Sequence, residues 1–106
     1  MGRLVWTEPA LDDVHEIVRF IAKDSPRYAQ KVASDIIETA RRVVAEPRTG
    51  WRVPEFEDDL IRELLCYSYR VIYAIRDDEC YVVAVVHGSR DLVRLFQQRG
   101  QLPPAG

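Results

Sequence analysis

The hydrophobic pattern of this chain changes period once, and that change limits the folds it can adopt. Before Pro47, apolar side chains recur at helical spacing over residues 8–23 and again over residues 26–46. After Gly50, the apolar residues fall instead into short extended runs. The sequence therefore predicts two amphipathic helices followed by a β-sheet.

Residues with capping side chains precede both helical stretches. Thr7 stands two residues before Pro9, and Ser25 stands directly before Pro26. Hydroxyl side chains are favoured at the N-cap, and proline is tolerated in the first helical turn because its missing N–H has no partner there. We expect the two helices to begin after Thr7 and Ser25.

Three β-rich runs follow, over residues 60–66, 69–76 and 80–87. The pairs Tyr67-Ser68 and Asp77-Asp78 separate them. Connections of two residues are typical of β-hairpins, so the runs should form an antiparallel meander.

The remaining segments complete an α+β fold. Residues 3–6 are expected to form an opening strand, and residues 91–98 a short C-terminal helix. The predicted architecture is an N-terminal strand and helical hairpin packed on a small twisted antiparallel sheet, in the order β-α-α-β-β-β. We expect one domain over residues 1–98 and a loose tail over residues 99–106.

The middle run gives the sheet two chemically different faces, because alternate residues of a strand point to opposite sides. One face carries Tyr69, Val71, Tyr73 and Ile75, and the other carries Arg70, Ile72, Ala74 and Arg76. One face should meet the helices. The other is left for a partner, a substrate or the C-terminal segment.

Charge and composition exclude several classes of protein. The formal net charge is −2, whereas a generic nucleic-acid binder is clearly basic. Two cysteines and two histidines without metal-ligand spacing predict neither a disulfide framework nor a metal site, and no cofactor is expected. The chain has no secretion signal and no apolar run long enough for a membrane span, so we expect it in the cytoplasm.

An ordered set of short motifs resembles the RelE/ParE superfamily of bacterial toxins over residues 3–96. The helical part of the match is Ala10, Asp13, Val14 and Ile17. The strands carry the more specific part, which is Ile61-Arg62-Glu63-Leu64, Tyr69-Arg70-Val71-Ile72-Tyr73, Val85-Val86-His87 and then Arg90. Membership implies the toxin of a type II toxin–antitoxin system, held in a hetero-oligomer by a cognate antitoxin.

The superfamily has two branches that act on different targets. RelE-like members resemble nucleases that cut messenger RNA on the ribosome, whereas ParE-like members poison DNA gyrase. Under the RelE-like hypothesis, Arg70 and Arg90 match the arginines that hold phosphate, and His87 could act as acid or base. Arg70 alone does not discriminate, because an ion pair with Glu63 or with the antitoxin explains it equally well.

Two departures from the RelE-like pattern favour the ParE-like branch. Phe96 stands about where RelE-like nucleases carry a catalytic tyrosine, and phenylalanine has no ionisable group. The stretch 47–59 lacks the lysines that such nucleases place beside the phosphate and carries Glu55, Glu57, Asp58 and Asp59 instead. We therefore favour a gyrase inhibitor, with an mRNA endonuclease and a decayed member that only binds its antitoxin as alternatives.

The antitoxin-binding surface is expected on the polar face of the meander. Its predicted residues are Arg62, Arg70, Ile72 and Arg76. Arginines beside apolar side chains suit an acidic, amphipathic partner that lays a helix on the hairpin or adds a strand to the sheet.

Overall fold

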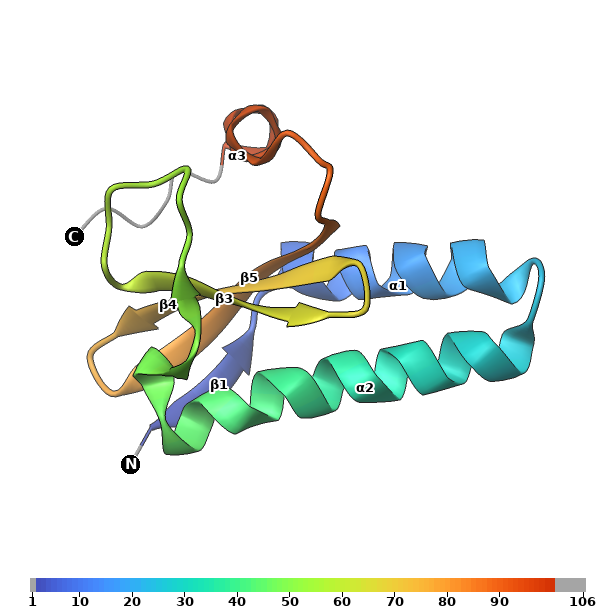
Figure 1. Ribbon diagram of the computed structural model, residues 1–106, viewed down its shortest axis with the longest axis horizontal. Helices are drawn as coiled ribbons and strands as arrows, with labels where there is room; N and C mark the ends of the chain where they lie inside the picture. The colour runs from blue at the N-terminus through green and yellow to red at the C-terminus, as the bar shows by residue number, and fades with distance from the viewer. Residues whose placement is uncertain (1, 101–106) are drawn as a thin grey trace.

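The computed structural model describes residues 2–100 as a helical hairpin, a five-stranded sheet and a short terminal helix (Figure 1). The order of elements is β1 (Arg3–Trp6), α1 (Glu8–Ala22), α2 (Pro26–Ala45), the 3-10 turn η1 (Pro47–Thr49), β2 (Trp51–Arg52), β3 (Ile61–Cys66), β4 (Tyr69–Arg76), β5 (Glu79–His87) and α3 (Leu92–Arg99).

Both predicted N-caps are confirmed. The Thr7 hydroxyl accepts a hydrogen bond from the backbone N–H of Ala10 and donates one to the carbonyl of Val82, at 2.7 Å. The Ser25 hydroxyl accepts one from the N–H of Tyr28 at 3.1 Å. Thr7 therefore starts α1 and also ties that start to β5.

The sheet has the strand order β1-β5-β4-β3-β2. The β3–β4–β5 meander is antiparallel, as predicted. The sequence assigned no pairing to the N-terminal strand, and the structure makes the sheet mixed at this edge, because β1 pairs in parallel with β5. The helical hairpin between β1 and the meander is long enough to act as the crossover that a parallel pair requires. The two-residue strand β2 was not predicted, and it closes the opposite edge by pairing with β3.

The two hairpin turns fall at the expected dipeptides. Tyr67 has a φ of 56° and Asp77 a φ of 54°, both in the left-handed region. Tight two-residue hairpins need positive φ, since only then does the turn follow the twist of the strands. The backbone at these positions thus keeps the three long strands in register.

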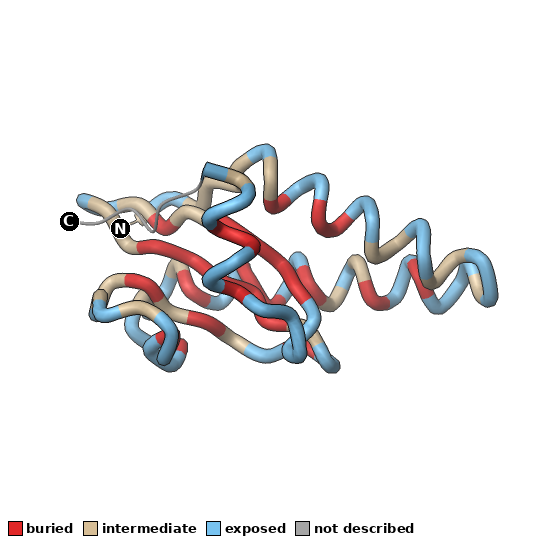
Figure 2. The backbone as a smooth tube through the Cα atoms, turned by 90° about the horizontal axis from the view of Figure 1, so that it is seen from above, coloured by how far each residue is buried: buried red, intermediate tan, exposed pale blue. Residues whose placement is uncertain are grey.

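Each face of the sheet has its own apolar core, and the predicted division of β4 is confirmed. The face bearing Val71 packs on α1 and α2. The face bearing Ile72 and Ala74 packs beneath α3, which lies on the far side of the sheet from the hairpin (Figure 1). The buried stretches run through the central strands, while the outer faces of the helices are exposed (Figure 2).

The C-terminal segment, rather than an open surface, covers the second face. Asp91 caps α3 by accepting a hydrogen bond from the N–H of Arg94, and Gly100 ends it with a left-handed φ of 63°. Arg99, which the sequence had placed at the start of a loose tail, belongs to α3. The rest of that predicted tail, residues 101–106, lies outside the described residues.

Two features of the described chain bear on its chemistry. Cys66 and Cys80 are both buried and form no disulfide, and burial raises the pKa of the Cys80 thiol. None of the helices in residues 2–100 is long and apolar enough to cross a membrane.

Candidate functional site

Arg70, the arginine at the centre of the sequence motif, is enclosed by carboxylates of its own chain. Its two terminal nitrogens donate to the two oxygens of Glu55 at 2.7 and 2.8 Å. Its Nε donates to Glu63 on the neighbouring strand β3. The Arg70 side chain is only 9% exposed. The predicted ion pair with Glu63 is confirmed, and the bidentate partner Glu55 is added to it.

Glu55 and Glu63 more than neutralise the positive charge of Arg70. One guanidinium faces two carboxylates, so the formal charge of this cluster is +1 − 2 = −1. The hydrogen bonds from Arg70 lower the pKa of Glu55, and those same carboxylates raise the pKa of Arg70. A planar guanidinium fork can hold carboxylate or phosphate in the same way. Here a carboxylate already occupies the fork.

His87 lies on the other face of the sheet from Arg70. Tyr69 is opposite His87 in the β4–β5 ladder, and Arg70 is opposite Val86. Directly opposed residues share a face, while consecutive residues alternate. The His87 ring contacts Tyr69 edge-on with centroids 6.0 Å apart, and its Nδ1 accepts a hydrogen bond from the backbone N–H of Ser89. His87 therefore closes the turn that follows β5.

Arg90 lies with His87 rather than with Arg70. A groove of about 320 Å³ runs between α1 and the end of β5, and its lining includes Phe20, Tyr69, His87 and Arg90. The sequence proposed Arg70, His87 and Arg90 as one nuclease site. The structure brings His87 and Arg90 together but leaves Arg70 on the opposite face.

Phe96 is a core residue of α3 that packs against the second face of the sheet. It is 2% exposed and lies against Phe56, with ring centroids 5.3 Å apart. Phe56 belongs to the segment between β2 and β3 that also carries Glu55. The aromatic pair and the Arg70–Glu55 contact together fix this segment across the sheet.

The four predicted antitoxin-binding residues differ in accessibility. Arg70 is largely enclosed, and Ile72 has no exposed surface because α3 covers it. Arg76 donates to Asp58 at 3.1 Å, with a side chain 23% exposed. Arg62 is bonded to Asp59 and to the carbonyl of Gly50. A partner would touch Ile72 only if α3 moved away.

Sequence reasoning gave Asp13 no role beyond its place in the first helix. Asp13 is 7% exposed and accepts a hydrogen bond from the N–H of Val85 at 2.9 Å. It also pairs with Arg99 of α3. The β1–β5 ladder ends at Val82, so Asp13 satisfies an N–H of β5 beyond it. Its place in the family-like motif of the first helix was the available signal.

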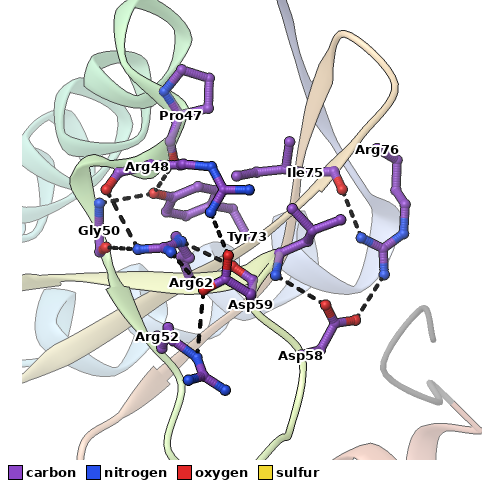
Figure 3. A network of polar contacts seen from close by, with 11 residues as sticks. Pro47, Arg48, Gly50, Arg52, Asp58, Asp59, Arg62, Tyr73, Ile75 and Arg76 are labelled. Carbon is purple, nitrogen blue, oxygen red and sulfur yellow. Dashed lines mark hydrogen bonds and ion pairs between the residues drawn. The ribbon is translucent and has the colours of Figure 1, made fainter. Parts of the chain in front are cut away.

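A second group of arginines lies at the β2 edge, and the sequence had singled out only one of its members, Arg62. Arg48, Arg52 and Arg62 converge on Asp59 (Figure 3). We call these four residues the β2-edge arginine cluster. No periodic pattern marks it, because its members come from a turn, a two-residue strand, β3 and the connecting segment.

Tyr73 anchors the backbone next to this cluster. Its hydroxyl donates to the carbonyl of Pro47 at 2.6 Å and accepts from the N–H of Gly50 at 3.0 Å (Figure 3). A side chain at Gly50 would meet the Tyr73 hydroxyl and the Glu63 carbonyl at 2.6 Å, so only glycine fits. Burial raises the pKa of Tyr73, which keeps the hydroxyl protonated as a donor.

Comparisons with known proteins agree with this architecture. The family model described as "ParE toxin of type II toxin-antitoxin system, parDE" matches residues 4–92. A solved structure titled "Chromosomal ParDE TA system from P. aeruginosa" has a TM-score of 0.69 and 21% sequence identity, and the match covers 82% of this chain and 96% of that one. No curated protein matches significantly.

The family match spans both the helical hairpin and the whole meander, in the order that the sequence motifs indicated. The structural match shows the same fold at low identity. This chain therefore belongs to the ParE toxin family of type II toxin–antitoxin systems.

Proposed function

We propose that this chain arrests bacterial growth by inhibiting DNA gyrase in the cytoplasm, and that a cognate antitoxin neutralises it in a hetero-oligomer. The observation that carries the proposal is the family match over residues 4–92. The geometry of the Arg70 cluster supports the gyrase branch over the nuclease branch.

Metal-free RNA cleavage needs cationic groups free to stabilise charge on phosphorus, together with an acid and a base beside it. Arg70 is the motif arginine, yet Glu55 and Glu63 fill its fork. A phosphate would have to displace the bidentate Glu55 and then lie beside the carboxylate of Glu63. This geometry favours a structural role for Arg70.

The other groups proposed for nuclease chemistry do not complete such a site. Phe96 is buried against Phe56 and has no proton to transfer. His87 lies on the opposite face from Arg70. These placements support a toxin that acts by binding its target.

Antitoxin binding is proposed at residues that the sequence indicated: Arg62, whose side chain is 13% exposed on the sheet face that bears Tyr73, and Arg76, which is 23% exposed on the face that bears Ile72. Both already hold carboxylates of this chain, Asp59 and Asp58. Engagement of Ile72 would require α3 to leave the sheet, and engagement of Arg70 would require Glu55 to release its guanidinium. A complex that includes them would therefore carry the energetic cost of opening the second core.

Induced expression in a bacterial host tests the proposal. We expect growth arrest and induction of the DNA-damage response, with ribosome-bound messages intact by primer extension and growth restored by the antitoxin. Messages cut within codons would establish the RelE-like alternative. Unimpaired growth at verified soluble expression would indicate a decayed member that only binds its antitoxin.

A pair of variants sharpens this experiment. Arg90 is exposed in the turn after β5, and Arg94 is exposed on α3. Arg90→Gln removes a predicted phosphate-binding group, and Arg94→Gln is the matched change of charge nearby. The gyrase proposal expects no cleavage from either variant or from the wild type. Cleavage abolished by Arg90→Gln and kept by Arg94→Gln would contradict it.

A further inference from the structure

We infer that the β2-edge arginine cluster binds an extended, acidic segment of a protein partner. The cluster consists of Arg48, Arg52, Arg62 and Asp59, of which only Arg62 was anticipated as a binding residue (Figure 3). Identifying this partner as the antitoxin rests on the proposed function, whereas the binding of an acidic segment does not.

The cluster has unbalanced charge. Three arginines share one carboxylate, so the formal charge is +3 − 1 = +2, on a chain whose total is −2. Arg52 and Arg62 also stand directly opposite one another in the β2–β3 ladder. Like charges at opposed positions destabilise a sheet, and an added anion relieves that repulsion.

The spare hydrogen-bond donors belong to the two exposed arginines. Arg62 is largely buried and donates hydrogen bonds to the carbonyls of Arg48, Gly50 and Asp59 and to the Asp59 carboxylate. Arg48 and Arg52 have side chains 58% and 57% exposed. The Nε of Arg52 lies 3.7 Å from Asp59, beyond hydrogen-bonding distance, and the Arg52 side chain makes no other polar contact within residues 2–100. Both guanidinium groups can therefore donate hydrogen bonds to a further carboxylate.

Trp51 adds an apolar contact at the same edge. It is 74% exposed and precedes Arg52 in β2, so the two side chains point to opposite faces of the terminal strand. An extended segment lying along β2 would match this arrangement if acidic and apolar residues alternated in it. Tryptophan and arginine are also the residues most enriched among the energetic hot spots of interfaces.

The surroundings favour a protein segment over nucleic acid. The ligand that the cluster already holds is a carboxylate, Asp59. Glu57 and Asp58 lie in the same connecting segment, and the whole chain is acidic. A long polyanion such as nucleic acid would be repelled by these acidic groups along its length. A short acidic segment would contact only the positively charged cluster.

Peptide titration tests the inference. The probe is a synthetic peptide in which glutamate alternates with leucine, compared with the same peptide carrying lysine for glutamate. We expect saturable binding of the acidic peptide alone, by calorimetry and by a change in the fluorescence of the exposed Trp51. Arg48→Gln/Arg52→Gln should weaken binding roughly tenfold, and the matched control Arg27→Gln/Arg42→Gln, on the exposed face of α2, should leave it unchanged.

A third variant predicts a change in the opposite direction. Asp59→Asn removes the resident carboxylate, so the acidic peptide should bind more tightly, by about threefold or more. Thermal unfolding checks that each variant is folded. Equal binding of both peptides, equal weakening by both arginine pairs, weaker binding by Asp59→Asn, or preferential binding of an oligodeoxynucleotide would each overturn the inference. None of these measurements involves gyrase, so they are independent of the proposed function.

Discussion

The two arginine sites of this toxin use the same chemistry for different ends. Arg70 is enclosed, holds two carboxylates and has no free fork. Arg48 and Arg52 are more than half exposed and share one carboxylate with Arg62. The motif arginine therefore serves the fold, while arginines outside any motif have the unused binding capacity. Burial and the ratio of charges, rather than position in a family pattern, separate the two roles.

The largest effect is expected for Arg70→Ala. The change leaves Glu63 buried and Glu55 partly buried without a cation, and removing one partner of a buried ion pair costs about 3 kcal/mol or more. Unfolding in urea, followed by circular dichroism, measures the loss. A loss below about 1 kcal/mol would mean that the cluster adds little to the fold, and the contrast between the two sites would fail.

The pH dependence of stability gives a second, smaller test. Because Arg70 lowers the pKa of Glu55, the folded-state value lies below the unfolded value of about 4.3. The resulting stability is complete above about pH 5 and is lost as the pH falls through the folded pKa. Glu55→Gln should cost about 1 kcal/mol or less near neutrality and should flatten the decline between about pH 5 and pH 3. An unchanged acid profile would remove Glu55 from the account.

Much of the fold follows from the sequence. Hydrophobic periods, caps and two-residue turns located both helices and the three long strands within one residue of the observed bounds. These signals depend only on residues that are close together in the chain, so a single sequence is enough to detect them. The parallel pairing of β1 with β5 and the two-residue strand β2 could not be predicted. Pairing between distant segments leaves no hydrophobic pattern in the sequence, and a strand of two residues is too short to show one.

The site was less predictable, because partners are chosen in three dimensions. The alternation of β4 correctly separated Tyr69 from Arg70, but it could not reveal that Glu55 reaches Arg70 from 15 residues away. The helical pattern around Asp13 indicated no partner for it, yet this residue satisfies an N–H of β5 and pairs with α3. In both places a charged side chain is buried because distant groups neutralise it.

The smallest effect is expected at the β2 edge. Arg48→Gln/Arg52→Gln should change the free energy of unfolding by less than about 0.5 kcal/mol, since exposed ion pairs contribute little. The urea measurement used for Arg70→Ala applies here, with Arg27→Gln/Arg42→Gln as the control. A loss of about 2 kcal/mol or more would show that these arginines, like Arg70, are needed by the fold.

Supercoiling by purified DNA gyrase is the most direct test of the account. With the purified toxin present, we expect concentration-dependent inhibition of supercoiling. Phe96→Leu should retain most of that inhibition, because it keeps a similar apolar volume in the core. Full supercoiling activity at saturating folded toxin would contradict the central claim that this ParE family member acts on gyrase.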